Sequence, residues 1–162
     1  MSLLIKDRIN SLLVTGNYSP LFFQQFVDSV KSGTIDFGQL AKEIEYLEGI
    51  RSYSTTKKEV MFKRSLLNGL WHKHFFNAHN IPTNCSNMLT KQQEKICRKN
   101  LDEDEFLSAI LNIVNKSIVN RQKTGDWIVY KKTDKGNFYL TLAKHTESDE
   151  KIYNRIKQYL TN

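Results

Sequence analysis

The sequence predicts an α+β fold that is predominantly helical, with six to seven helices, a late antiparallel β-hairpin and a C-terminal helix. Two patterns lead to this prediction. Along most of the chain, helix-capping residues precede segments in which apolar residues recur about every 3.6 residues, as in a helix. From residue 126, apolar residues recur every second residue, as in a strand. The length of 162 residues and a hydrophobic content of 40% allow a buried core without disulfides or metals. We therefore expect a single compact domain over residues 1–162.

Three helices are expected in the first fifty residues, each with one apolar stripe that must pack against a neighbour. Small polar side chains precede the first turns and glycines follow the last turns, as is typical of helix termini. These start and stop pairs are Ser2 with Gly16, Ser19 and Pro20 with Gly33, and Asp36 with Gly49.

The middle of the chain carries the longest helical pattern. Thr56 and Glu59 have the spacing of a capping box and introduce a helix from Lys57 to about Ala78, which cannot pass Pro82. Two further helices are expected over residues 90–98 and 102–118, where caps again precede apolar residues.

A β-hairpin is expected after residue 125. Apolar and polar positions alternate over residues 127–130 and 138–143, and a glycine-containing turn over residues 133–137 joins the two strands. An isolated hairpin is marginal in water, so it must lie on the helices or recruit a third strand, for which residues 51–54 are a weak candidate. Ser148 caps a last helix.

Charge is distributed unevenly. The net charge is −2 over residues 1–50, +8 over residues 51–100 and +1 over residues 101–162. Clustered positive charge attracts polyanions, so RNA or another polyanion is an expected partner. The change of sign also suggests a seam near residues 49–56, between an acidic helical N-terminal part and a basic α+β remainder.

The sequence motifs exclude several classes of function. The two cysteines form no disulfide framework or zinc motif, and no segment has the character of a signal peptide or membrane span. We therefore expect a cytoplasmic protein without membrane contact. Glycine-rich nucleotide motifs are missing, so no cofactor is expected.

Three of the four histidines lie within residues 69–79. On the expected helix, His72 and His74 point about 200° apart and cannot share one metal ion, so no metal site is predicted. His74 is interpreted as a core histidine. The fourth histidine, His145, follows the second hairpin strand, a position at which a rigid scaffold can present a reactive group.

A helix carrying His72 that packs near the hairpin would bring two imidazoles together. Cleavage of RNA through its own 2′-hydroxyl needs a base, an acid and groups that stabilise the charged phosphorane. Imidazoles serve in both proton transfers near neutral pH, lysines hold phosphates and aromatic rings stack unpaired bases. The candidate catalytic residues are His145, His72, Tyr130 and Thr141, and the candidate substrate-binding residues are Lys144, Lys73, Lys131 and Trp71.

The sequence therefore predicts a small metal-independent endoribonuclease that uses histidine acid/base chemistry. Its plan of helices followed by a late sheet with scattered His, Tyr, Thr and Lys is similar to that of small bacterial toxin ribonucleases, an analogy that carries over no residue. The alternative is a non-catalytic interaction protein, such as an inhibitor, immunity or phage accessory factor. Its basic middle segment would dock an acidic partner, and the protein partner would be an antitoxin, an immunity protein or an acidic host protein.

Overall fold

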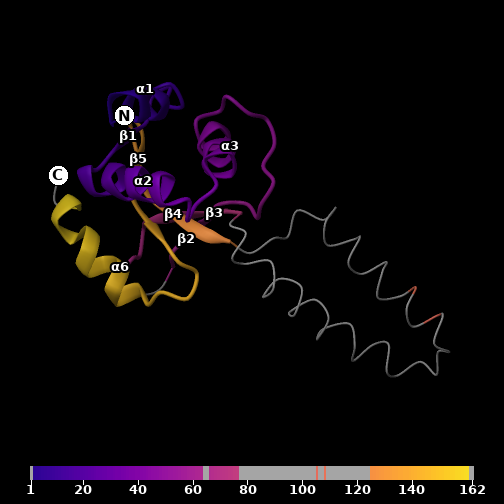
Figure 1. The fold of residues 1–162 in the computed structure, drawn as a ribbon. Helices are drawn as coiled ribbons and strands as arrows, with labels where there is room; N and C mark the ends of the chain where they lie inside the picture. The colour runs from indigo at the N-terminus through magenta and orange to yellow at the C-terminus, as the bar shows by residue number, and fades with distance from the viewer. Residues whose placement is uncertain (1, 64–65, 77–104, 106–107, 109–124, 161–162) are drawn as a thin grey trace.

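The computed structural model describes residues 2–63, 66–76, 105, 108 and 125–160. Its main elements follow one another along the chain as labelled in Figure 1. In order they are α1 (Ser2–Asn10), β1 (Asn17–Tyr18), α2 (Pro20–Ser32), α3 (Phe37–Leu47), β2 (Val60–Met61), β3 (Trp71–Phe75), β4 (Asp126–Thr133), β5 (Gly136–Ala143), α6 (Asp149–Ile156) and the short 3-10 helix η2 (Lys157–Tyr159).

The strands form one mixed sheet in the order β1-β5-β4-β3-β2. The β1 strand pairs with β5 in parallel, whereas the other neighbours are antiparallel. Beyond the two residues of β1, side chains complete the outer edge of β5. The Ser19 hydroxyl donates to the Leu140 carbonyl at 2.7 Å, and the Gln25 side chain accepts from the Leu142 N–H at 2.9 Å. The edge of β5 is therefore covered by the N-cap and the first half of α2.

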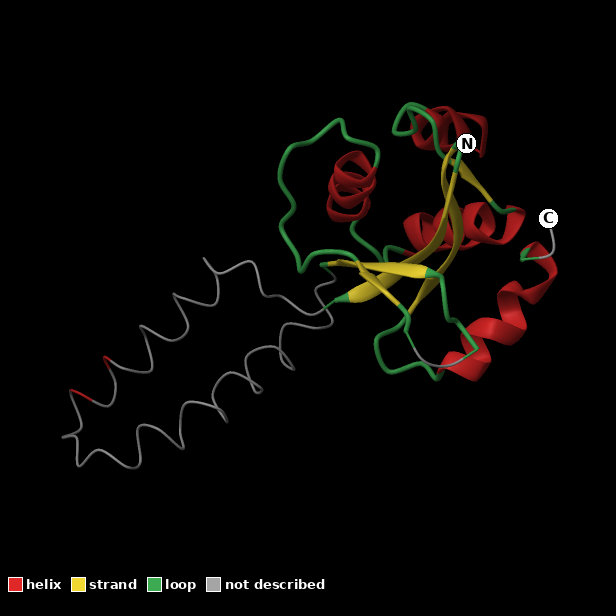
Figure 2. Ribbon diagram, turned by 180° about the vertical axis from the view of Figure 1, so that it is seen from behind, coloured by secondary structure: helices red, strands yellow, loops and turns green. Residues whose placement is uncertain are grey.

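Helices pack on both faces of this sheet (Figures 1 and 2). The N-terminal helices share a core with one face, whose buried members include Phe22 and Phe26 of α2, Leu40 and Ile44 of α3, and Phe75, Ile128, Tyr130 and Tyr139 of the strands. The opposite face packs against α6 and the turn before β3, through Leu67, Leu70, Val129, Leu140, Ala143, Ile152 and Ile156. The sheet is thus the middle layer between two apolar clusters.

The prediction of a predominantly helical fold with six to seven helices is wrong. The described residues hold four α-helices and a five-stranded mixed sheet. The error lies in the helix expected from Lys57 to Ala78, where the structure has β2, a turn and β3. All five residues of β3 pair with β4, and this pairing overrides the local helical pattern. Thr56 does not cap a helix, because its hydroxyl donates to the carbonyl of His74 at 2.5 Å.

Most of the remaining predicted elements in the described ranges are confirmed. Ser19, Asp36 and Ser148 accept backbone N–H groups as the N-caps of α2, α3 and α6, and Gly33 ends α2 with a φ of 66°. The hairpin forms as β4 and β5. The first helix ends at Asn10 rather than near Val14. Residues 51–54 form a loop instead of a strand, and the helices expected over 90–98 and 102–118 fall almost wholly outside the described residues.

The loop over residues 50–57 passes through the position of the predicted seam. The Thr55 N–H donates to Glu43 of α3 at 3.1 Å, while Thr56 bonds the backbone of β3, so this loop is fastened on both sides. The single domain with a seam near residues 49–56 stays a prediction.

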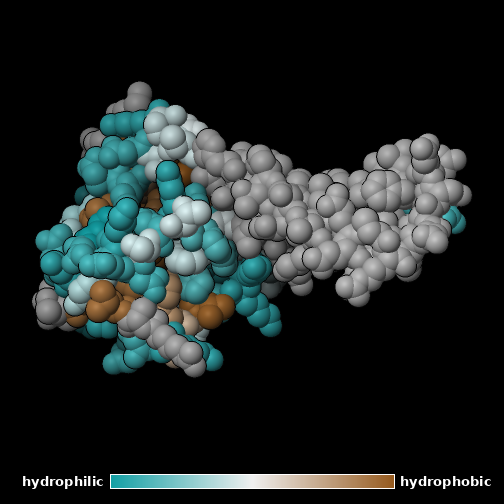
Figure 3. Space-filling view, turned by 90° about the horizontal axis from the view of Figure 1, so that it is seen from below, coloured by the Kyte–Doolittle hydropathy of each residue, from teal (hydrophilic) through white to brown (hydrophobic). Residues whose placement is uncertain are grey.

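The described surface seen in Figure 3 is mostly hydrophilic, with separate hydrophobic patches. Large apolar side chains more than a third exposed include Val14, Ile50, Val60 and Leu66. Within the described ranges, no helix combines the length and the apolar character that crossing a bilayer requires.

Candidate functional site

The candidate site is a cluster of three imidazoles around one indole ring, here called the imidazole cluster and made of His72, His74, Trp127 and His145. His72 and His74 alternate along β3 with Trp71 and Phe75, which pack in the core under the N-terminal helices, so both imidazoles lie on the opposite face of the sheet. Trp127 of β4 is the register partner of His74. His145 follows β5 directly, in the segment that leads to α6. Three strands therefore converge on the cluster.

Ring contacts hold the imidazole cluster together. The Trp127 ring centroid lies 4.8 Å from that of His72 and 5.1 Å from that of His145. The His74 ring lies 5.6 Å from both other imidazoles. Phe62 closes the other side, 4.6 Å from His72 and 5.8 Å from Trp127. Trp127 and His74 thus both contact His72 and His145, which are far apart in the sequence.

The three imidazoles differ in exposure. His74 is buried, His72 is partly buried and His145 is exposed. Burial lowers the pKa of His72 to about 4, the charge of His145 lowers it further and Asp149 opposes the shift. Burial also lowers the pKa of His74 to about 4, against a hydrogen bond with Gly125 that raises it. His72 and His74 are therefore neutral at pH 7 and carry lone pairs that can accept protons.

The orientation of His74 is fixed by the backbone at the start of β4. Its Nδ1 lies 3.1 Å from the carbonyl oxygen and 3.3 Å from the N–H of Gly125. A Cβ at position 125 would stand 1.8 Å from the Phe75 carbonyl oxygen, so only glycine allows this approach. Gly125 thus holds the buried imidazole in place.

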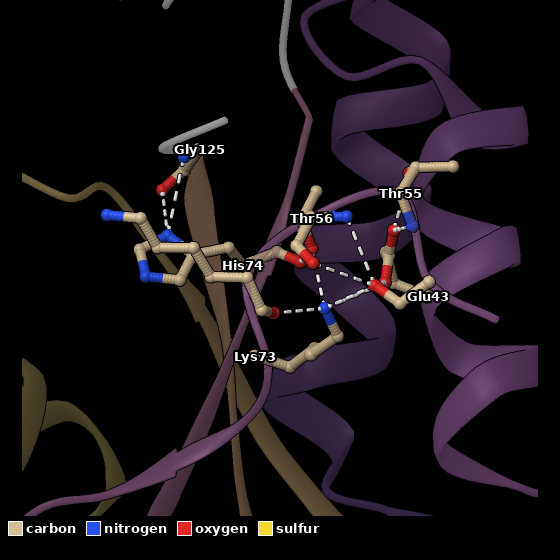
Figure 4. Close-up of polar contacts among 8 residues, drawn as sticks. Glu43, Thr55, Thr56, Lys73, His74 and Gly125 are labelled. Atoms are coloured by element: carbon tan, nitrogen blue, oxygen red, sulfur yellow. Dashed lines mark hydrogen bonds and ion pairs between the residues drawn. The ribbon is translucent and has the colours of Figure 1, made fainter. Parts of the chain in front are cut away.

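Lys73 points to the opposite side of β3, toward α3, as Figure 4 shows. Its Nζ lies 2.9 Å from the Glu43 carboxylate, and neither side chain is exposed. The ammonium also donates to the Ser54 and Thr56 hydroxyls at 2.7 and 2.5 Å and to the Lys57 carbonyl at 2.6 Å. This network, here called the Lys73 network, anchors the loop over residues 50–57 to the strand that carries His72 and His74.

The structure brings together two of the four predicted catalytic residues, His72 and His145, because both contact Trp127. Tyr130 does not join them: it is fully buried in the core under the N-terminal helices, 5.9 Å from the Tyr139 ring. Thr141 is also fully buried, and its hydroxyl donates to Gln25 of α2 at 2.8 Å. Neither hydroxyl is in place to touch a substrate at the imidazole cluster.

The predicted substrate-binding residues are divided in the same way. Lys144 is exposed and directly precedes His145. Lys73 is occupied by its buried ion pair, and Trp71 packs against the core on the opposite face, with the Lys132 ammonium 3.9 Å from its ring centroid. Lys131 is partly exposed farther along β4. Of the four predicted substrate-binding residues, Lys144 is therefore the one next to a member of the imidazole cluster in the sequence.

Sequence reasoning missed Trp127 and Phe62 and treated His74 as an isolated core residue. Recognising residues 71–75 as a strand would have joined His74 to His72, because residues two apart on a strand share one face. It would not have found Phe62, which lies outside this strand. In the described part of the chain, no group of three His, Cys, Asp or Glu residues is arranged to hold a metal ion.

The imidazole cluster offers neutral nitrogen bases and an exposed imidazole, and an exposed lysine precedes that imidazole in the sequence. These groups suit proton transfer beside an anionic group. No protein-family model matches this chain, and neither does any curated protein or solved structure.

Proposed function

We propose that the protein is a small endoribonuclease that acts in the cytoplasm and cleaves RNA at the imidazole cluster without a metal ion. The observation that carries the proposal is the convergence of His72 and His145 on Trp127. Paired imidazoles, one partly buried and one exposed, can supply the base and the acid that cleavage of a phosphodiester requires.

We assign the base and the acid from the different exposures of His72 and His145. His72 is neutral at pH 7 because burial lowers its pKa to about 4, so it takes the proton of the ribose 2′-hydroxyl. The 2′-oxygen then attacks phosphorus, the bond from phosphorus to the 5′-oxygen breaks, and protonated His145 gives its proton to that oxygen. The products are a 2′,3′-cyclic phosphate and a free 5′-hydroxyl.

Substrate binding strengthens the base. A pKa of about 4 makes His72 a weak base in the free protein. An anionic phosphodiester beside the ring favours the protonated imidazole and raises this pKa toward neutrality. Lys144, exposed and next to His145 in the sequence, supplies a positive charge for the phosphate.

Cleavage of a labelled RNA in EDTA tests the proposal. We expect the wild-type chain to cut RNA and His145→Ala to lose at least about a hundredfold in rate, the usual contribution of a general acid. His145 is exposed, so this variant should melt within a few degrees of wild type. Thr146→Ala, a change at the next exposed position, is the matched control and should cleave normally. Unchanged cleavage by His145→Ala would refute the mechanism.

The alternative, docking of an acidic protein partner through the basic middle segment, stays a prediction. Only part of this segment is described, and there Lys73 is buried while Lys57, Lys58 and Lys63 are exposed. An antitoxin, an immunity protein or an acidic host protein would be the partner. A chain that leaves RNA intact but forms a 1:1 complex whose association rate falls steeply with salt would favour this alternative.

A further inference from the structure

Two polar atoms in the imidazole cluster are buried without a hydrogen-bond partner among the described residues: Trp127 Nε1 and His72 Nδ1. Buried polar groups are almost always hydrogen-bonded, so each exception needs an explanation. These two belong to rings that contact each other, with centroids 4.8 Å apart. Two unpaired atoms on contacting rings suggest a site at which one ligand binds both.

The chemistry of the two atoms defines that group. An indole N–H can only donate, and a neutral imidazole donates from Nδ1 in one of its two tautomers. In that tautomer both nitrogens of the pair are donors, and the Nε2 of His72 keeps its lone pair. A phosphoryl oxygen, which accepts several hydrogen bonds and carries negative charge, satisfies both donors.

We propose that Trp127 Nε1 and His72 Nδ1 form a subsite for a phosphoryl oxygen. This inference rests on the proposed function and deepens it. Trp127 donates to a non-bridging oxygen of the phosphodiester and stabilises the charge that grows there as the phosphorane forms. The Nε2 of His72 then takes the proton of the 2′-hydroxyl. Trp127 thus becomes a catalytic residue that sequence reasoning missed.

His145 is the exposed member of the imidazole cluster and contacts Trp127. Both unpaired atoms are shielded from solvent, whereas His145 is exposed and its ring lies against Trp127 at 5.1 Å. His145 belongs to the segment between β5 and α6, which is exposed at Lys144, His145 and Thr146. We therefore expect a phosphate to approach Trp127 beside His145, which would leave the acid next to the bound phosphate.

The chain contains two tryptophans, Trp71 and Trp127, so its indole N–H resonances report on the subsite directly. We expect inorganic phosphate, added at constant ionic strength, to shift the Trp127 resonance saturably and to leave the Trp71 resonance in place. Trp71 is an internal control, because Lys132 lies over its ring and would report on phosphate held by a surface lysine. A Trp127 resonance that does not move, or moves only in step with Trp71, would overturn the inference.

Trp127→Phe adds a kinetic test, because it keeps an aromatic ring against His72 and His145 but removes the donor. We expect RNA cleavage to fall about a hundredfold to a thousandfold, as for loss of one oxyanion donor. Normal cleavage by this variant contradicts the subsite even if the ribonuclease proposal holds. A phosphate shift at Trp127 in a wild-type chain that leaves RNA intact supports the subsite and refutes the ribonuclease proposal. If Trp127→Phe fails to fold, the phosphate titration of the wild-type protein still tests whether the subsite binds phosphate.

Discussion

Replacing Lys73 with methionine should destabilise the protein far more than removing any surface lysine. The ion pair between Lys73 and Glu43 is completely buried, with 0% exposure on both side chains. Burial raises the pKa of Glu43, but hydrogen bonds from Ser54 and Thr55 and the charge of Lys73 outweigh it and leave the pKa below its usual value. Burial lowers the pKa of Lys73 despite its partner. Lys73→Met leaves the Glu43 carboxylate charged, buried and without its counterion.

The expected loss is about 3–5 kcal/mol of unfolding free energy, the usual cost of removing one partner from a buried pair. Urea denaturation followed by circular dichroism measures it. The matched control is Lys132→Met, which removes a 2.8 Å ion pair with Glu59 whose side chains are 43% and 26% exposed. This control also removes the ammonium from above the Trp71 ring, so it should cost up to about 2 kcal/mol, still less than Lys73→Met.

A double variant tests whether the unpaired Glu43 charge causes the loss of stability in Lys73→Met. Adding Glu43→Gln to Lys73→Met removes the unpaired charge, so the double variant should lose clearly less than the sum of the two single variants. Equal, small losses for Lys73→Met and Lys132→Met would show that the buried pair is not what fastens the loop over residues 50–57 to β3.

Two further predictions concern acid stability and a second buried carboxylate. The pKa values of His72 and His74 are about 4 in the folded chain and about 6.5 when unfolded. The unfolded chain therefore binds more protons between these values, and urea midpoints should fall as the pH drops from about 6.5 to 4; a flat profile would contradict the burial of these rings. Glu48→Gln should cost about 1–3 kcal/mol in the same assay, because the Glu48 carboxylate accepts three N–H groups from residues 14–16 and the Tyr139 hydroxyl at 2.5 Å. Glu45→Gln, which alters a partly exposed pair with Arg51, should cost clearly less.

Elements with local signals could be predicted from the sequence. The α2, α3 and α6 helices begin at Ser19, Asp36 and Ser148 because a cap and its apolar stripe lie within one short segment. The β3 strand could not be predicted in this way. Trp71, His74 and Phe75 share one arc of a helical wheel, so the local pattern favoured a helix, while the decisive pairing with β4 lies about fifty residues away.

Only part of the candidate site was predicted. A β-bulge explains why Tyr130 and Thr141, which were expected beside His145, lie elsewhere. Strict alternation places Tyr139, Thr141 and Ala143 on one face of the hairpin. The register of β4 and β5 shifts between Val129 and Tyr130, so Tyr139 packs under the N-terminal helices and Ala143 packs on the opposite face. His145, two residues after Ala143, therefore reaches the imidazole cluster, whereas Tyr130 packs with Tyr139 on the other face. Such a register shift has no signal in the local sequence.

The parallel pairing of β1 with β5 has a consequence for synthesis on the ribosome. Asn17 pairs with Phe138, and Ser19 bonds the backbone of Leu140. The first helices therefore emerge long before the strands on which they rest have been translated. Because closing so long a loop costs entropy before any contact forms, we expect the first helices to lack their tertiary contacts until β5 has been synthesised, and the domain to fold slowly for its size.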